Sequence, residues 1–149
     1  MFRIGLVSDT HDLLRPEVLA FLRGSDHIVH AGDICGPEVI AALAQLAPLT
    51  VVRGNNDRGD WAQDIPEAVT VQLAGVRLHV VHDLAELVLP GEAKVVVTGH
   101  SHRPRVEERD GVLYVNPGSA GPRRFKLPIS AGELLVDGSA ITPRLVTFL

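Results

Sequence analysis

Five short apolar runs along the chain each end in a small group of Asp, Asn, His or Gly residues, and this pattern constrains the fold most. The five groups are Asp9-Thr10-His11, Gly32-Asp33, Gly54-Asn55, His82 and Gly99-His100-Ser101-His102. Apolar runs of this length are typical of buried strands. Because ligands bind beyond the carboxyl ends of strands in open α/β sheets, we expect the five groups to face one pocket.

The first half of the chain alternates between strand and helix patterns. Residues 4–7, 27–30 and 49–52 are predicted strands. Helices are predicted from Pro16 and from Pro37, because both prolines precede apolar residues at helical spacing. Strand-helix-strand order favours parallel pairing and an α/β architecture.

The second half consists mostly of hairpin patterns. The predicted strands are 69–73 with 76–81, then 95–98 alone, 105–108 with 112–115, and 130–136 with 141–148. Asp110-Gly111 and Asp137-Gly138 supply two of the turns. We therefore predict an α/β fold in which the two halves pack as two mixed sheets, within one domain spanning residues 1–149.

Composition excludes several classes of protein. With 46% hydrophobic residues and a net charge of −4, the chain is neither disordered nor a basic binder of nucleic acid or membrane surfaces. Cys35 is the only cysteine, so no internal disulfide forms and a reducing cytoplasm is the expected location. No apolar run approaches the roughly 20 residues of a membrane span, and no signal-peptide pattern opens the sequence.

The polar groups form a set of metal donors. They contain two carboxylates, one amide and four imidazoles, without a thiolate. Such donors suit manganese, iron, cobalt, nickel or zinc better than calcium or a structural zinc site. Seven donors are too many for one tetrahedral ion, but they fit two ions about 3.5–4 Å apart that share a bridging carboxylate.

Each part of this pattern has a simpler explanation when taken alone. Asp9-Thr10-His11 is a common surface sequence, His82 could be a core histidine, and Gly54-Asn55 is a good turn. Their joint occurrence at strand ends favours the metal site. Glycines at 32, 54 and 99 would let the backbone turn and approach the ions closely.

In order, these groups and Asp57 resemble the signature of the calcineurin-like metallophosphoesterase superfamily. Asn116-Pro117-Gly118-Ser119 with Pro122-Arg123 resembles its small YfcE-type phosphodiesterase branch, and the resemblance covers about residues 3–125. It implies a two-sheet sandwich flanked by helices, two ions that are often manganese or nickel, and assembly into dimers or larger homo-oligomers. It also implies a metal-dependent phosphodiesterase that acts on small or nucleotide-like esters.

The resemblance assigns roles to individual residues. One ion would be held by Asp9, His11, Asp33 and His102, and the other by Asp33, Asn55, His82 and His100. Asp33 would bridge the ions, and a hydroxide bridging them would attack phosphorus. Asp33, Asn55 and His100 are the expected catalytic residues, whereas Asn56 and Arg123 are expected to bind substrate.

The chain departs from the family pattern at two positions. Asn56 stands where the protein phosphatases of the superfamily have a proton-donating histidine, and this favours activated phosphodiesters over monoesters. Asp83 stands where a glycine often follows His82. Its carboxylate either lines the pocket and repels phosphate, or faces a helix amino end with Leu84 in the core.

Four further residues have open or structural interpretations. His30 either orients Asp33 or is a core histidine bonded to backbone. Cys35 is expected to be packed rather than reactive, and His27 and His79 to be structural.

Two other function classes compete with a phosphodiesterase. A protein-interaction scaffold on the same fold would be expected to have lost metal ligands, whereas all seven positions here carry Asp, Asn or His. A nuclease would be expected to have a basic groove, and the arginines cluster only weakly.

Overall fold

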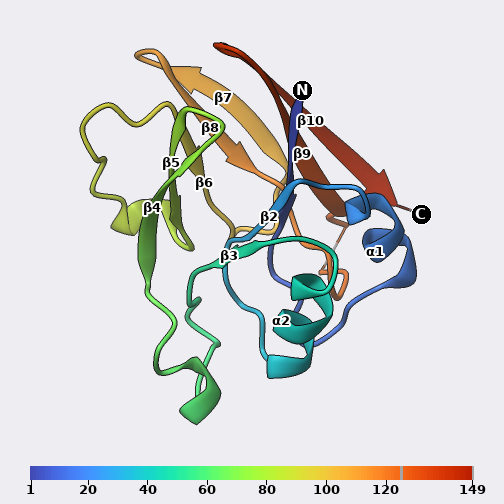
Figure 1. The fold of residues 1–149 in the computed structure, drawn as a ribbon. Coiled ribbons are helices and arrows are strands. Elements are labelled where there is room, and N and C mark those ends of the chain that lie inside the picture. The colour runs from blue at the N-terminus through green and yellow to red at the C-terminus, as the bar shows by residue number, and fades with distance from the viewer. Residues whose placement is uncertain (125, 149) are drawn as a thin grey trace.

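The computed structural model describes residues 1–124 and 126–148 and contains two mixed sheets of five strands each (Figure 1). The first sheet has the order β10-β9-β1-β2-β3, in which β1 pairs in parallel with β2 and β2 with β3. Its strands are β1 (Phe2–Val7), β2 (His27–His30), β3 (Leu49–Val51), β9 (Ile129–Asp137) and β10 (Ala140–Phe148). The predicted α/β two-sheet architecture is confirmed.

The second sheet has the order β4-β5-β6-β8-β7. Its strands are β4 (Ala68–Leu73), β5 (Val76–Val81), β6 (Val95–Val97), β7 (Arg105–Arg109) and β8 (Val112–Asn116). The three central strands β5, β6 and β8 run parallel, and the two edge strands pair antiparallel with their neighbours. The carboxyl ends of the central strands therefore meet at one edge.

The two helices connect the parallel strands of the first sheet. Both α1 (Pro16–Leu22) and α2 (Pro37–Ala44) begin at a proline, which needs no backbone hydrogen-bond donor there. Val18, Leu22, Val39 and Leu43 bury the apolar side of the helices against the first sheet. The described residues contain no helix long and apolar enough to cross a membrane.

The sheets do not follow the predicted division of the chain into halves. The hairpin of β9 and β10 is formed as predicted, but it extends the first sheet, because β9 pairs antiparallel with β1. This pairing covers an edge of β1 that would otherwise expose unpaired backbone groups. Two short 3₁₀ helices, η1 (Asp60–Ala62) and η2 (Leu84–Glu86), were not predicted.

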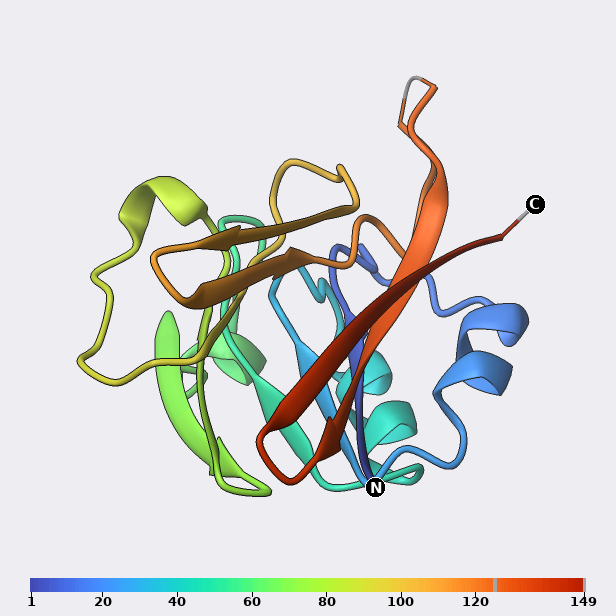
Figure 2. The same ribbon diagram turned by 90° about the horizontal axis from the view of Figure 1, so that it is seen from above.

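The main core lies between the two sheets. Ile4, Leu6 and Val29 of the first sheet pack with Leu78, Val80, Val95 and Val97 of the second. The outer face of the first sheet is covered by α1 and α2, and Figure 2 shows these helices on the side of the first sheet away from the second. Over the described residues, no α-helix covers the outer face of the second sheet.

Candidate metal centre

The five predicted groups meet where strands of both sheets end. Asp9 and His11 follow β1, Asp33 follows β2 and Asn55 follows β3, whereas His82 follows β5 and the pair His100 and His102 follows β6. The backbone of the first loops is joined by hydrogen bonds from Asp9 N to Gly32 O at 3.0 Å and from His11 N to Asp33 O at 3.0 Å. A bond from Gly99 N to His82 O at 2.9 Å joins the loops of the second sheet.

Five of these residues have a left-handed backbone conformation, which is uncommon for residues other than glycine. The φ angles lie between 46° and 70° at Asp9, His11, Asp33, His100 and His102. Such a conformation costs free energy and is concentrated at functional sites. The loops are therefore shaped to present these side chains, at some cost in backbone strain.

The predicted close approach at the glycines is present in the structure. A Cβ at Gly54 would collide with Asp33, and one at Gly99 would collide with Ser8 and Asp9. Gly32 has a φ of +102°, and a Cβ there would lie 2.7 Å from His82 Nδ1. These positions let three loops crowd around the two carboxylates.

Asp9, His11, Asp33, His82 and His102 converge on a small buried volume and are called the inner cluster below. Asp9 Oδ1 lies 3.4 Å from His102 Nε2, 3.8 Å from His82 Nε2 and 3.9 Å from His11 Nε2. Asp33 Oδ2 lies 3.3 Å from His82 Nε2 and 3.6 Å from His11 Nε2. Two overlapping groups, Asp9-His11-His102 and Asp9-Asp33-His82, each have their ligand atoms within 4.8 Å of one another.

Several polar atoms of the inner cluster are buried without a hydrogen bond. Among the described residues, Asp9 Oδ1, His11 Nε2 and His82 Nε2 have no hydrogen-bond partner. His82 Nδ1 lies 2.7 Å from Ala31 O, so it carries the proton and leaves Nε2 with a free lone pair. Buried polar atoms are rarely left unpaired in proteins, and this donor set fits divalent metal ions.

The charges within the inner cluster are strongly coupled. Burial raises the pKa of the Asp33 carboxyl, but the adjacent His82 ring and the hydrogen bonds from Asn56 outweigh burial and hold that pKa well below its ordinary value. Burial lowers the pKa of His82, but the carboxylates of Asp33 and Asp9 raise it overall. For His11 burial prevails and its pKa is lowered. The two carboxylates thus make the pocket attractive to cations.

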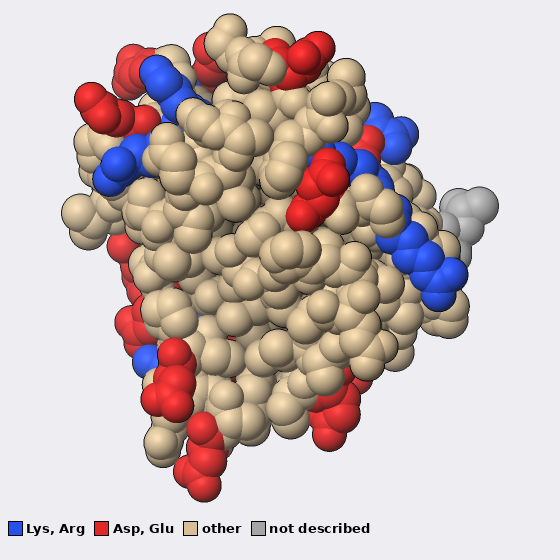
Figure 3. All heavy atoms as spheres, viewed as in Figure 1, with Lys and Arg blue, Asp and Glu red and all other residues tan. Residues whose placement is uncertain are grey.

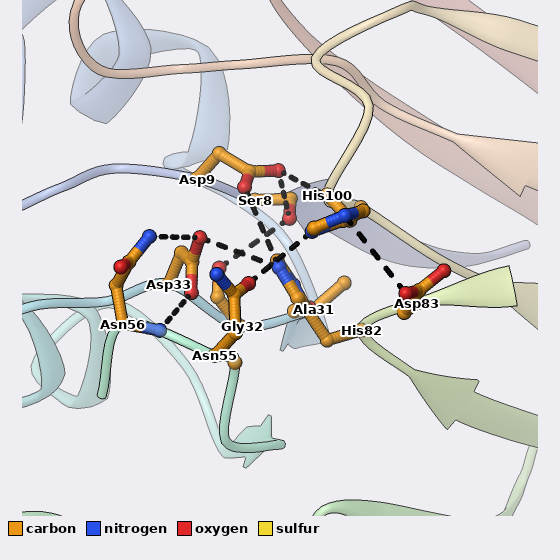
Figure 4. Close-up of polar contacts among 12 residues, drawn as sticks. Ser8, Asp9, Ala31, Gly32, Asp33, Asn55, Asn56, His82, Asp83 and His100 are labelled. Atoms are coloured by element: carbon orange, nitrogen blue, oxygen red, sulfur yellow. Dashed lines mark hydrogen bonds and ion pairs between the residues drawn. The ribbon is translucent and has the colours of Figure 1, made fainter. Parts of the chain in front are cut away.

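Asn55 and His100 lie at the mouth of the pocket and are called the outer pair below. His100 has 46% of its side chain exposed. Figure 4 shows its ring between Asn55 Oδ1, at 3.2 Å from Nδ1, and Asp83 Oδ2, at 3.8 Å from Nε2. The backbone N–H of His100 donates to Asp9 Oδ2 at 3.1 Å. The outer pair therefore adjoins the inner cluster, and His100 belongs to neither of the two carboxylate–histidine groups found there.

The two expected substrate-binding residues have different surroundings. Asn56 donates twice to Asp33, from its backbone N to Oδ1 at 2.9 Å and from Nδ2 to Oδ2 at 3.0 Å. Arg123 is exposed beside Pro122. The charge of the next residue, Arg124, is close enough to His11 to contribute to the lowering of its pKa, after burial.

The alternatives for Asp83 are both partly correct. Its Oδ1 accepts from Ala85 N at 3.0 Å and caps η2, while its Oδ2 faces His100 at the pocket mouth. The expectation of a buried Leu84 is wrong, because 43% of Leu84 is exposed. A single 3₁₀ turn is too short to bury that side chain and cap the loop together.

His30 is the core histidine bonded to backbone rather than a direct partner of Asp33. Its Nδ1 accepts from Gly32 N at 3.1 Å, so Nε2 carries the proton and donates to Thr10 Oγ1 at 3.0 Å. Burial lowers its pKa to about 4, and the ring is neutral. It contacts the backbone of the Asp33 loop at Gly32 and the hydroxyl of Thr10 in the Asp9 loop.

The remaining interpretations of single residues agree with the structure. His27 pairs with Thr50 Oγ1 at 2.7 Å, and His79 pairs with Thr70 Oγ1 at 2.8 Å. Cys35 is half-buried, and burial with nearby Asp57 and Asp33 raises its pKa to about 11, so it stays a neutral thiol.

Two supporting residues were missed by the sequence analysis. Ser8 donates to Asp9 Oδ2 at 2.7 Å. Asp57 accepts from Gly54 N and from Cys35 N, both at 2.8 Å, and so joins the loops that carry Asn55 and Asp33. Asp57 belongs to the motif already identified, and its spacing after Gly54 was the available signal.

Charged side chains show no continuous basic surface on the face of the described residues seen in Figure 3. Acidic and basic groups are scattered over that face, with basic ones both along the side of α1 and β10 and at the upper left of the view. This distribution agrees with the weak nucleic-acid signal in the sequence.

Comparisons with known proteins place the chain in a family. The model of the calcineurin-like phosphoesterase superfamily domain matches residues 2–138. A probable metallophosphoesterase of Methanothermobacter thermautotrophicus is 31% identical over 96% of this chain and 91% of its own length. A phosphodiesterase of Methanocaldococcus jannaschii is 30% identical over 78% of this chain and 82% of its own length.

Solved structures have the same fold. An archaeal phosphodiesterase, 26% identical, covers 99% of this chain and 100% of its own with a TM-score of 0.82. Vacuolar protein sorting 29 of Cryptosporidium parvum, 20% identical, covers 99% of this chain and 98% of its own with a TM-score of 0.77, a likeness of fold alone. On the family match and the identity to its relatives, the chain belongs to the calcineurin-like phosphoesterase superfamily.

Proposed function

We propose that the chain is a phosphodiesterase that uses two divalent transition-metal ions, manganese first among them, with nickel, iron, cobalt or zinc as alternatives. The observation that carries this proposal is a set of buried atoms in the inner cluster that form no hydrogen bond with any described residue: Asp9 Oδ1, His11 Nε2 and His82 Nε2. A polar atom buried without a partner costs about 1–3 kcal/mol, and a metal ion would remove that cost. The phosphodiesterase names among the relatives support the substrate class.

We propose the ligand sets implied by the family resemblance. Asp9, His11, Asp33 and His102 would hold one ion, and Asp33, Asn55, His82 and His100 the other. Asp33 Oδ2 lies 3.6 Å from His11 Nε2 and 3.3 Å from His82 Nε2, so this carboxylate adjoins one histidine of each proposed ligand set. When bound, the ions would lower the pKa of a coordinated water and neutralise the phosphate oxygens.

The outer residues would act on the substrate. Besides ligating the second ion, the exposed side chains of His100 and Asn55 would be in position to contact the phosphate. The side-chain amide of Asn56 is occupied by Asp33 and cannot protonate a leaving oxygen, which favours diesters with good leaving groups. Arg123 is proposed to contact the phosphate as a bidentate donor.

The test is hydrolysis of bis(p-nitrophenyl) phosphate by chelator-stripped protein titrated with manganese, with p-nitrophenyl phosphate in parallel. We expect manganese-dependent turnover that favours the diester. His82→Gln should abolish it, whereas the control His79→Gln, three residues earlier on β5 and paired with Thr70, should retain it. Equal turnover without metal, or in His82→Gln, would overturn the proposal.

A scaffold without catalytic activity is the competing proposal. It would be favoured if the manganese-loaded chain hydrolysed neither ester. The cytoplasm remains the proposed location, because the lone Cys35 thiol requires no oxidising compartment.

A further inference from the structure

A second cavity lies beside the metal centre, on the outer face of the second sheet. It has a volume of about 250 Å³ and is lined by residues of η2, the loop after β6, and the strands β7 and β8. Leu84 and Tyr114 supply its apolar side chains. This is the sheet face that the described α-helices leave uncovered.

The cavity adjoins the outer pair. His100 lines it, and Asp83 lines both this cavity and a neighbouring one that contains Asn55 and His82. In Figure 4 the His100 ring separates Asp83 from Asn55. A group that extends from a phosphate held at the inner cluster can therefore pass His100 and enter the cavity.

The charges of the cavity do not suit a second phosphate. Asp83 and Glu107 balance Arg103 and Arg105 among its lining residues. Arg105 is already paired with Glu107 at 3.0 Å. The cavity therefore offers no net positive charge to a further anion.

Tyr114 is placed to contact a planar group. It pairs across the strands with Glu107, and the guanidinium of Arg109 lies 5.1 Å from its ring centroid. The ring is thus held by strand pairing and a cation–π contact while it lines the cavity. Aromatic rings held in this way are stacking platforms for bases.

We propose that this cavity binds one uncharged aromatic arm of the diester, of the size of a nucleobase, while the phosphate lies at the metal centre. Its volume is below the range of pockets for drug-sized ligands, which suits a single ring system. The proposal rests on the proposed phosphodiesterase function and names the substrate class: nucleotide-like diesters rather than dialkyl or polyphosphate esters.

The experiment measures equilibrium binding of adenosine 5′-monophosphate and of ribose 5-phosphate to the manganese-loaded chain. The two probes share phosphate and sugar, so the ratio of their dissociation constants reports the base alone. We expect the first to bind about tenfold tighter, which is within the range for stacking of one base. Tyr114→Leu and Leu84→Ala should each reduce this ratio to below about threefold.

Leu89→Ala is the matched control, because Leu89 follows η2, is 46% exposed and does not line the cavity. It should leave the ratio unchanged. Equal binding of the two probes by the native chain, no binding of either, or an unchanged ratio in both cavity variants would overturn the proposal. Failure to hydrolyse any diester with the ratio intact would overturn the proposed function alone.

Discussion

The inner cluster and the outer pair are built differently, although the same sequence pattern predicts both. The inner side chains are buried or nearly so, and several of their atoms have no hydrogen-bond partner among the described residues. Asn55 and His100 are exposed and contact each other. An unpaired buried atom indicates a place for a cation, whereas an exposed and paired one is suited to meet substrate.

This difference assigns separate roles to the two regions. Strained loops and three close glycine contacts fix the inner cluster before any ligand arrives. His100 is tied to the cluster by its backbone bond to Asp9 and by an edge-on contact of its ring with His82, at 5.2 Å between ring centroids, but 46% of its side chain is exposed. Changes to the inner cluster should cause the larger loss of metal, whereas changes to the outer pair should weaken metal binding less and lower turnover.

The largest effect is expected from Asp33→Asn, which keeps the shape of the side chain and removes the charge between His11 and His82. Manganese affinity should fall by more than about 100-fold and diester turnover should be lost. Metal content after equilibrium dialysis measures the first effect. Asp137→Asn, in the exposed turn of the last hairpin, is the control, and equal metal retention in both variants would remove the distinction between regions.

The matched pair His102→Ala and His100→Ala separates the two regions most sharply. His102→Ala removes a buried ligand and should release manganese. His100→Ala removes an exposed ligand proposed for the other ion, so it should weaken manganese binding less than His102→Ala does and lower turnover by about 10- to 100-fold. Measuring metal content and kcat for both variants decides the matter. Equal loss of metal in His102→Ala and His100→Ala would show that the outer pair contributes to metal binding as much as the inner cluster does.

The adjacent amides give a smaller contrast. Asn56→Ala removes the Nδ2 bond to Asp33 but keeps the backbone bond, so manganese affinity should fall about tenfold. Asn55→Ala should lower turnover more than it lowers manganese affinity. Calorimetric titration of manganese into both variants, with turnover measured beside it, provides the comparison. A loss of manganese affinity in Asn55→Ala as large as its loss of turnover would contradict it.

The smallest effect concerns His30, which supports the inner loops without facing the metal. Its pKa is lowered by burial from 6.5 to about 4, so the unfolded chain binds the extra proton between these values. The contribution of the neutral His30 ring to the free energy of unfolding is complete above pH 6.5. It decreases as the pH drops toward 4, by at most about 1.4 kcal/mol per pH unit. In urea unfolding of metal-free protein, His30→Gln should make the free energy of unfolding decrease less steeply between pH 6.5 and 4 than in the native chain. Equal slopes against pH for the two proteins would refute this prediction.

The sequence predicted the strands well where apolar runs end at clear turns. The strand from His27 to His30 and the strand from Val76 to Val81 have the predicted limits. The sheet to which the last hairpin belongs was not predictable, because pairing of β9 with β1 depends on which edge is open in three dimensions. The turns η1 and η2 are shorter than any periodic pattern can reveal.

The pattern of polar residues at strand ends identified the site, but it could not predict which of these residues are buried and which lie at the mouth. Asn55 and Asn56 are chemically identical neighbours, and only the loop conformation decides which amide faces Asp33. Asp83 forms a hydrogen bond with η2 and faces His100, and both contacts depend on a short turn that no periodic sequence pattern predicts. Residue type predicted the chemistry of the site, whereas exposure and hydrogen bonding required the fold.

The central claim is that the inner cluster, together with the outer pair at its mouth, is a binding site for two metal ions that would share Asp33. Equilibrium dialysis of the chelator-stripped chain against manganese, with metal and protein measured independently, tests it most directly. The account predicts two ions per native chain and at most one in His102→Ala. Saturation at one ion or none in the native chain would contradict it.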